Sequence, residues 1–402
     1  MAFNPRVLVV TSKNEAAAAI AAINPDTAGA EIMTPKAVFR VVKVSGVDWR
    51  AANILKQEML ARGADAALPW DSQDAQSLAT DVLLMGTTKQ FETLTENLRL
   101  QPYGLKQVGV ELKAALEVYE RKPADIEWAG YSLPFSQRTC VMGILNVTPD
   151  SFSDGGRFAE PAAAVEQALR LQGAGADVID IGGESTRPGA KAISTEEEKQ
   201  RVLPVIEALA GRLAVPISID TYKADIARAA LDAGAAMVND ISGLTFDGDM
   251  AGLVAERGVP IVLMHIKGKP LDMQQNPEYT SVMGEISAYL RERAETALAA
   301  GVFPAKIIID PGLGFGKTME HNLEIIHRLR ELTTLGYPVL LGPSRKAFIG
   351  KILGTEIDNR LEGTAAAVTA AVLNGAAMVR VHDVKEMARV VRVADAIAGL
   401  LA

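Results

Sequence analysis

The sequence has a single cysteine, Cys140, and no basic run of five or more residues. One cysteine excludes an intramolecular disulfide and a thiolate-rich metal site, and a reducing cytoplasm is the expected location. Acidic residues outnumber basic ones by 49 to 41, which gives a net charge of −8. A mildly acidic chain gains no electrostatic attraction to a phosphate backbone or an anionic membrane. We therefore expect no nucleic-acid partner and no membrane partner.

Long apolar segments are also missing. Every apolar run stops well short of the roughly 18 residues that suggest a transmembrane helix, so no membrane span is expected. The chain starts with a strand-like run at residues 6–10 instead of a basic segment followed by a long apolar one, so we expect no signal peptide. Hydrophobic residues make up 49% of the chain, which is ordinary for a globular protein. A length of 402 residues predicts two domains.

Residues 1–125 are predicted to form a small α/β or α+β domain. Short apolar runs indicate strands at 6–10 and 37–44, and apolar residues recur with helical spacing in three segments, 49–62, 88–100 and 108–120. This region has no histidine, no glycine-rich turn before a helix and no carboxylates at metal-binding spacing. We expect it to have a packing or oligomerisation role. Residues 126–138 are predicted to be a linker.

Strand-like and helix-like segments alternate regularly in residues 139–402. Short β-branched runs recur, each followed by a polar loop and a helical segment long enough to cross to the next parallel strand. Eight such units predict a (β/α)8 barrel, with a doubly wound open sheet as the alternative. The absence of a dinucleotide-binding fingerprint favours the closed barrel. The eight predicted strands are 141–146, 178–182, 217–220, 237–240, 261–265, 307–310, 339–342 and 378–381.

The first of these strands runs into an unusually polar loop. The strand ends at Asn146, and residues 148–158 then supply hydroxyls, carboxylates and glycines. Such a loop suits a substrate that carries a phosphate or a metal, because it offers oxygen ligands and hydrogen-bond donors.

Polar side chains also follow the other strands, and in a barrel the carboxyl ends of the strands converge on one mouth. Burying so many polar groups costs free energy unless a ligand satisfies them, so the set predicts a binding site. Asp220, Asn239 and Asp310 suit a flat heterocycle with N–H donors on one edge, such as a guanine-like or pterin-like ring. The cationic or donor side chains at the mouth suit an anion such as pyrophosphate; they are Arg187, Lys346, Arg380 and His382.

Several tempting motifs fail. Residues 312–318 resemble a phosphate-binding P-loop, but Pro311 stands where the first glycine belongs. A dinucleotide-binding reading fails because Lys317 replaces the third glycine. His321 and His327 lie six residues apart on one predicted helix, which does not suit a shared metal. No Gly-x-Ser-x-Gly motif supports a hydrolase.

Several longer motifs in residues 139–402 resemble the dihydropteroate synthases, within the wider group of pterin-binding barrels. Residues 1–130 lie outside this resemblance. The matching segments are Asn-Val-Thr-Pro-Asp-Ser-Phe-Ser-Asp-Gly-Gly at 146–156, Gly-Ala-Asp-Val-Ile-Asp-Ile-Gly-Gly-Glu-Ser-Thr-Arg-Pro-Gly at 175–189, Ser-Ile-Asp-Thr at 218–221, Asn-Asp at 239–240, Asp-Pro-Gly-Leu-Gly-Phe-Gly-Lys at 310–317, Gly-Pro-Ser-Arg-Lys at 342–346 and Arg-Val-His-Asp at 380–383.

The resemblance implies a transferase of folate biosynthesis. It would condense 6-hydroxymethyl-7,8-dihydropterin pyrophosphate with 4-aminobenzoate, with Mg²⁺ as cofactor, and a homodimer is expected. Asn146 would be a metal ligand. The implied catalytic residues are Asp220, Lys346, Arg187 and Asp310. The implied substrate-binding residues are Thr186, Asp220, Asn239, Asp310, Phe315, Gly342, Ser344, Lys346, Arg380, Val381 and His382.

One segment departs from the expected pattern, because Lys267 and Lys269 place two charges in the loop after His265. We interpret His265 as a structural histidine at the end of a strand. The nearest alternative function is a methyltransferase that uses methyltetrahydrofolate and a corrinoid, which would not need the diphosphate loops. A non-catalytic pterin-binding protein is the alternative of another class.

Overall fold

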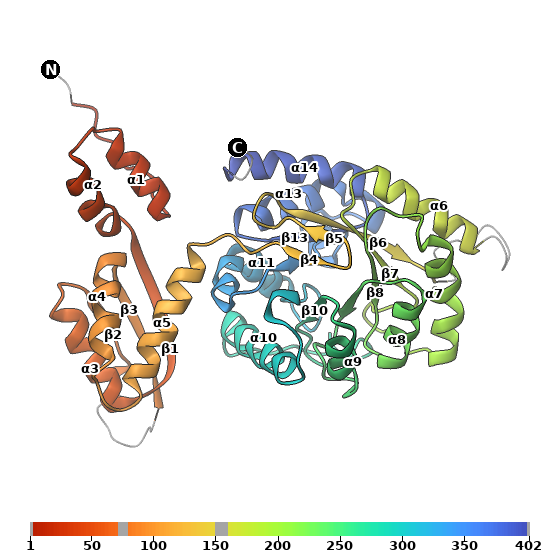
Figure 1. Cartoon of the computed structure of the whole chain (residues 1–402), viewed down its shortest axis with the longest axis horizontal. Coiled ribbons are helices and arrows are strands. Elements are labelled where there is room, and N and C mark those ends of the chain that lie inside the picture. The colour runs from red at the N-terminus through yellow and green to blue at the C-terminus, as the bar shows by residue number, and fades with distance from the viewer. Residues whose placement is uncertain (1–2, 71–78, 149–159, 400–402) are drawn as a thin grey trace. The chain divides into compact units, whose positions relative to one another are not determined.

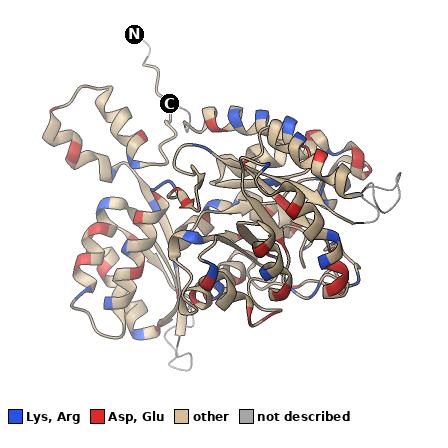
Figure 2. Ribbon diagram, turned by 45° about the vertical axis from the view of Figure 1, so that its right-hand side comes forward, with Lys and Arg blue, Asp and Glu red and all other residues tan. Residues whose placement is uncertain are grey.

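The computed structural model describes residues 3–70, 79–148 and 160–399. The chain divides into two compact units, Met1–Arg121 and Lys122–Ala402 (Figure 1). None of the helices in the described ranges is long and apolar enough to cross a membrane. Figure 2 shows Lys and Arg interspersed with Asp and Glu along the helices.

The N-terminal unit is built on a three-stranded antiparallel sheet with the order β1-β3-β2. Its core includes Leu55, Phe91, Leu94 and Leu105, which come from the helices and are almost fully buried. The elements of this unit are α1 (Lys13–Ala21), α2 (Thr27–Met33), η1 (Thr34–Lys36), β1 (Phe39–Asp48), α3 (Trp49–Leu60), β2 (Asp65–Ala67), β3 (Ala79–Thr87), α4 (Thr88–Leu98) and α5 (Leu105–Tyr119).

The secondary structure predicted for this unit is confirmed except at its start. Strand β1 and helices α3, α4 and α5 lie where the sequence places one strand and three helices, with shifted ends. The predicted strand at residues 6–10 is wrong, because this segment has no regular secondary structure and joins no sheet, and Val7 is 98% exposed. Strand propensity depends on context, so an apolar run without a pairing partner does not become a strand.

The second unit is a barrel of eight parallel strands in the order β11-β10-β9-β8-β7-β6-β13-β12. A parallel bridge between Ile309 and Val339 links the two ends of this order, which confirms the predicted (β/α)8 architecture. The strands are β6 (Cys140–Asn146), β7 (Val178–Gly182), β8 (Ile217–Asp220), β9 (Met237–Asp240), β10 (Ile261–Met264), β11 (Ile307–Asp310), β12 (Leu340–Leu341) and β13 (Met378–Val381).

Helices follow the strands in turn. Ser194 caps the first turn of α7 by accepting a hydrogen bond from the Glu197 N–H, and Thr318 caps α11 in a capping box with His321. Helix α11 is followed by the 3₁₀ helix η5 (Leu329–Leu335). The α-helices are α6 (Glu160–Gly173), α7 (Thr195–Leu209), α8 (Ala224–Ala233), α9 (Met250–Arg257), α10 (Val282–Ala299), α11 (Met319–His327), α12 (Ala347–Leu353), α13 (Leu361–Leu373) and α14 (Val384–Ile397).

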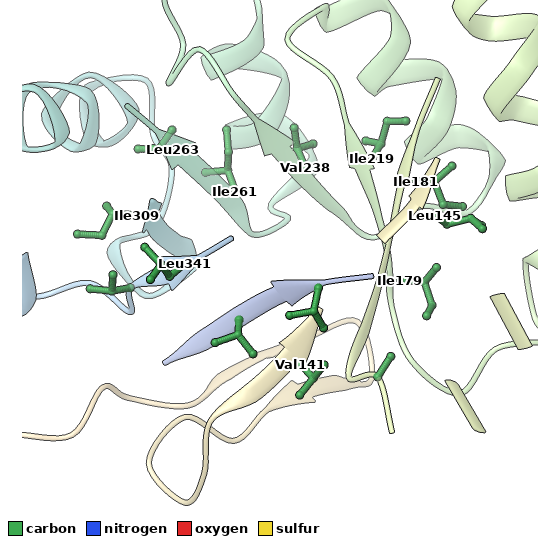
Figure 3. Packing of buried hydrophobic residues seen from close by; sticks show 14 of the residues in the cluster. Val141, Leu145, Ile179, Ile181, Ile219, Val238, Ile261, Leu263, Ile309 and Leu341 are labelled. Atoms are coloured by element: carbon green, nitrogen blue, oxygen red, sulfur yellow. The ribbon is translucent and has the colours of Figure 1, made fainter. Parts of the chain in front are cut away.

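Alternate strand residues point to opposite sides of the barrel wall. One set, which includes Val141, Ile179 and Ile219, belongs to the large core that the helices share (Figure 3). The other set, which includes Met142 and Val178, belongs to a separate cluster in the barrel interior. This alternation decides which polar residues of each strand can reach the interior.

A β-hairpin covers this interior cluster. Strands β4 (Ile126–Trp128) and β5 (Tyr131–Leu133) pair with each other, and Trp128 and Leu133 pack with the interior residues of the barrel strands. The Trp128 indole N–H donates to the Ala236 carbonyl at 2.8 Å. Residues 126–138, expected only to link two domains, are thus partly an integral piece of the barrel core.

Candidate active site

The polar interior residues lie in two levels above the apolar cluster. Asp180 pairs in register with Ser218, and both side chains are fully buried. Two residues further along β8, Asp220 pairs in register with Asn239 of β9. Because side chains repeat with a period of two, Asp180 and Ser218 lie one level deeper than Asp220 and Asn239.

The Arg380 guanidinium joins these levels. Its Nε donates to Asp180 Oδ2 at 2.6 Å, and its Nη2 donates to Asp220 Oδ2 at 2.6 Å. Asn239 Nδ2 donates to the same Asp180 oxygen at 3.0 Å. One cation and one amide therefore tie together residues from β7, β8, β9 and β13.

Burial raises the pKa of the two predicted ring-binding acids. The pKa of Asp220 rises to about 7 because the carboxyl is desolvated, while Arg380 opposes the rise and Asp180 adds to it. The pKa of Asp310 rises to about 6, again because of burial. The Gly312 N–H donates to Asp310 Oδ1 at 2.7 Å, which favours its ionised form. Both acids therefore change charge near neutral pH.

Lys346 shares this interior. Burial and the neighbouring Arg380 lower its pKa to about 8, although Asp310 and Asp220 favour the charged form. Its Nζ lies 4.5 Å from the centroid of the Phe315 ring, in cation–π contact. The cation and the ring therefore form a wall next to the two acids.

Ser344 and His382 come from neighbouring strand ends and contact each other. Ser344 Oγ lies 3.0 Å from His382 Nδ1, and the His382 backbone N–H donates to the same hydroxyl at 3.2 Å. Burial, followed by the charge of Arg380, lowers the pKa of His382 to about 3. His382 is therefore neutral at physiological pH and offers hydrogen bonds, not a positive charge.

The glycine-rich loop after β11 packs closely against the end of β10. A Cβ at Gly312, whose φ is +67°, would lie 2.0 Å from the His265 carbonyl oxygen, so no other residue fits there. Lys317 Nζ lies 2.9 Å from His265 Nδ1 and donates to the Phe315 carbonyl at 2.9 Å. This pairing supports the interpretation of His265 as structural, since the ring anchors the loop.

Known proteins are similar to this chain in fold and in sequence. A family model described as "Pterin binding enzyme" matches residues 142–382. The dihydropteroate synthase of Synechocystis sp. is 50% identical over 264 residues, which are 65% of this chain and 91% of that protein. The chain belongs to the dihydropteroate synthase family. The resemblance inferred from the motifs and the predicted enzyme class are thereby confirmed.

A solved structure of the same family agrees with the fold. The dihydropteroate synthase of Xanthomonas albilineans, determined with 4-aminobenzoic acid, is 45% identical, with a TM-score of 0.64. The similarity covers 69% of this chain and 98% of that one. Membership of the dihydropteroate synthase family therefore rests on the barrel.

The N-terminal unit has counterparts in another group of relatives. A probable bifunctional folylpolyglutamate synthase/dihydropteroate synthase of Haloferax volcanii is 42% identical over 368 residues. The aligned part is 89% of this chain but only 43% of that protein. An alignment of this extent includes much of the N-terminal unit as well as the barrel.

Most of the other residues to which the family resemblance gives a role are less buried than the acids of the barrel interior. Thr186 is half-buried and Arg187 is exposed, in the loop after β7. Asn146 is half-buried at the end of β6, where it pairs in register with Gly182. Gly342 is half-buried beside Arg380, whose Cβ is 3.8 Å from the position that a Gly342 Cβ would take. Most of the polar loop at 148–158 lies outside the described residues.

Val381 differs from the other predicted substrate-binding residues. Its side chain is fully buried in the core shared with the helices, on the opposite side of the strand from Arg380 and His382. Only its backbone can face a substrate. The strand alternation gives this result directly, and the motif alone does not reveal it.

Asp180, Arg345 and Lys317 lie in or near this interior and have no role in the family-based prediction. Asp180 is a carboxylate at an interior position of an otherwise apolar strand, a signal that the sequence already contains. Arg345 adopts a left-handed backbone with a φ of +56°, and its guanidinium binds Asp383 through two hydrogen bonds of 2.6 and 3.0 Å. Lys317 is buried, and burial lowers its pKa to about 7.

Proposed function

We propose that the barrel condenses 6-hydroxymethyl-7,8-dihydropterin pyrophosphate with 4-aminobenzoate and releases pyrophosphate and 7,8-dihydropteroate. The observation that carries this proposal is a set of acceptors at one end of the barrel, the buried Asn239 and Asp310 and the largely buried Asp220, with Lys346 beside them. A ring that presents several N–H groups along one edge satisfies these acceptors, and a pterin is such a ring.

The ring-binding roles follow from charge. Asp220 and Asp310 accept ring N–H groups and stabilise positive charge that develops on the pterin when the carbon–oxygen bond breaks. Lys346 lies against Phe315, forms no ion pair among the described residues, and has the largest effect of any cation on the pKa of Asp310. Lys346 donates hydrogen bonds to an acceptor on the ring, and Phe315 and Ser344 help to form the 4-aminobenzoate pocket.

The diphosphate group of the substrate needs hydrogen-bond donors or cations to bind it. Arg187 and Thr186 lie on an accessible loop, and neutral His382 offers a hydrogen bond. Arg380 was expected to bind pyrophosphate, yet its Nε and Nη2 are engaged by Asp180 and Asp220. We therefore propose that Arg380 mainly holds the ring-binding acids and that Arg187 meets the leaving group.

Mg²⁺ fits this site as an ion held mostly by the substrate. The described residues contain no group of three or more His, Cys, Asp or Glu side chains that could hold an ion. Asn146 offers one amide oxygen at the end of β6, and Mg²⁺ typically takes one or two protein ligands together with substrate phosphates and water. The ion, when bound, neutralises charge on the leaving pyrophosphate.

The activity is tested with the purified full-length chain, Mg²⁺ and both substrates. We expect dihydropteroate and pyrophosphate in equal amounts, and neither product when one substrate is omitted. Lys346→Ala should abolish turnover, whereas Lys351→Ala, an exposed lysine on the following helix, should leave it unchanged. No dihydropteroate with both substrates present would exclude the proposal and would favour a non-catalytic pterin-binding protein. The homodimer and the cytoplasmic location remain predictions.

A further inference from the structure

Asp180 is the deepest charged group of the barrel interior that the family-based roles do not use. Its side chain is fully buried, and its Oδ2 accepts hydrogen bonds from both Asn239 and Arg380. Its other oxygen, Oδ1, has no hydrogen-bond partner within the described part of the chain. Any effect of Asp180 on its neighbours through hydrogen bonds therefore comes from the two bonds at Oδ2.

The bond to Asn239 fixes which way the amide points. A carboxylate only accepts hydrogen bonds, so the Asn239 NH₂ group has to face Asp180. The Asn239 carbonyl oxygen is then left for the ligand. Without this bond the amide could turn and present a donor where the ligand also presents donors.

The bond to Arg380 fixes Asp220 in the same way. The guanidinium is planar, and it spans from Asp180 to Asp220 with bonds of 2.6 Å on each side. A carboxylate held in this way keeps one oxygen on Arg380 and directs the other away from it. Asp180 thus acts on two of the three ring-binding acceptors at once.

We propose that Asp180 is a positioning residue that determines specificity for the pterin ring by presenting Asn239 and Asp220 as acceptors. This inference rests on the proposed function and adds to it a residue that does not itself touch the substrate. A ligand edge made only of donors is favoured, and a ring with an acceptor in that position is rejected because two acceptors would be left facing each other.

The test measures binding of 6-hydroxymethyl-7,8-dihydropterin, which has the substrate's ring but no diphosphate, by fluorescence titration. Asp180→Asn keeps an acceptor and loses the charge, and we expect about 3-fold to 10-fold weaker binding. Asp180→Ala removes both bonds, and we expect about 10-fold to 100-fold weaker binding, as for loss of a hydrogen bond to a charged group. The KM for 4-aminobenzoate should change less than about 2-fold in Asp180→Asn, since that pocket is separate.

Asp240 supplies a matched control. It is an equally buried carboxylate on the neighbouring strand, but its bonds go to the Ser242 and Leu244 backbone N–H groups and the Ser242 hydroxyl. Asp240→Asn should lower the melting temperature and leave pterin affinity within about 2-fold. Equal loss of pterin affinity in Asp240→Asn and Asp180→Asn would reduce Asp180 to a structural role and overturn the proposal.

A double variant tests whether Asp180 acts through Asn239. If it does, the affinity lost in Asp180→Asn combined with Asn239→Ala should be smaller than the product of the two separate losses. Multiplying losses, or wild-type pterin affinity in Asp180→Asn, would contradict the proposal. If the wild-type chain binds pterin but forms no dihydropteroate, the proposed reaction is wrong. The role of Asp180 is still tested, because it is measured by pterin binding and not by turnover. If Asp180→Ala does not fold, Asp180→Asn decides the question.

Discussion

If Asp220 and Asp310 bind the pterin ring as proposed, their burial should make pterin binding depend on pH near neutrality. Their pKa values are raised to about 7 and about 6, so both are increasingly protonated as the pH falls from 7.5 to 5. A protonated carboxyl loses its charge and part of its capacity to accept N–H groups. We expect the affinity for 6-hydroxymethyl-7,8-dihydropterin to rise with pH through this range, measured by fluorescence titration.

The control for this dependence is Asp310→Asn, which removes the lower of the two titrations. The variant should bind more weakly at every pH, and its remaining dependence should centre near the pKa of Asp220. Arg380, Asp180, Glu198 and Asp240 are the charged groups whose fields act on Asp220, and all four persist in this variant. An affinity that does not change between pH 5 and 7.5 would contradict the assigned roles.

Arg345 stores backbone strain next to Lys346. A residue with a side chain at a φ of +56° costs roughly 1 kcal/mol or more relative to glycine. The Asp383 bonds and the Thr364 hydroxyl, which accepts the Arg345 N–H, hold it in place. The free energy of unfolding, measured with urea, should therefore be about 1 kcal/mol higher for Arg345→Gly than for Arg345→Ala.

The same pair of variants separates strain from function. Both lose the link from Arg345 to Asp383, which follows His382 directly, so both should lower kcat/KM by a similar factor. Arg345→Lys keeps the charge but not the paired bonds and should be intermediate in turnover. Equal stability of the glycine and alanine variants would exclude backbone strain at this position.

At the level of residues, the sequence predicts that Asp220 and Asp310 lie at one end of the barrel, because strand ends meet at its mouth. Their binding to a pterin ring stays a prediction. The sequence did not predict that Arg380 lies between two carboxylates or that His382 is neutral, since both depend on distances between strands that are remote in the sequence. It also did not separate Val381 from its neighbours. A motif lists adjacent residues, whereas the pleat sends them to opposite sides.

The β4–β5 hairpin is the element whose importance the sequence conceals. Its strands are three residues each, too short to be recognised by periodicity, and residues 126–138 are predicted from the sequence to be a linker. In the structure Trp128 is 7% exposed and closes the interior cluster of the barrel. The eight barrel strands were found because each is a β-branched run in a repeating context, which a short hairpin lacks.

Trp128→Ala should destabilise the barrel by about 3 to 5 kcal/mol, because it removes a large buried side chain from the interior cluster. Trp128→Phe keeps most of the apolar contact and loses the bond to the Ala236 carbonyl, so about 1 kcal/mol is expected. Glu127→Ala, at the exposed position between the buried Ile126 and Trp128, should have little effect on the free energy of unfolding. Urea unfolding followed by circular dichroism measures all three, and equal stability of Trp128→Ala and wild type would exclude a role in the core.

At the scale of the whole molecule, the two units are built differently. The barrel has its own core and contains every predicted site residue, while the N-terminal unit has a separate core around its small sheet. The Synechocystis relative aligns with a part of this chain no longer than the barrel unit and is itself 91% covered by that alignment. The chemistry should therefore belong to the barrel unit alone.

We expect a chain that starts at Lys122 to fold and to form dihydropteroate at a rate within about threefold of the full-length chain. A chain that starts at Ser136 is the matched control, because it lacks the hairpin and the Asp125 carboxylate that accepts the Ser136 N–H. It should be unstable or insoluble, since the interior residues of the barrel strands would then face water. If the chain from Lys122 is folded by circular dichroism but inactive, the N-terminal unit contributes to the reaction. In that case the bifunctional relatives, whose similarity extends into this unit, become the comparison to pursue.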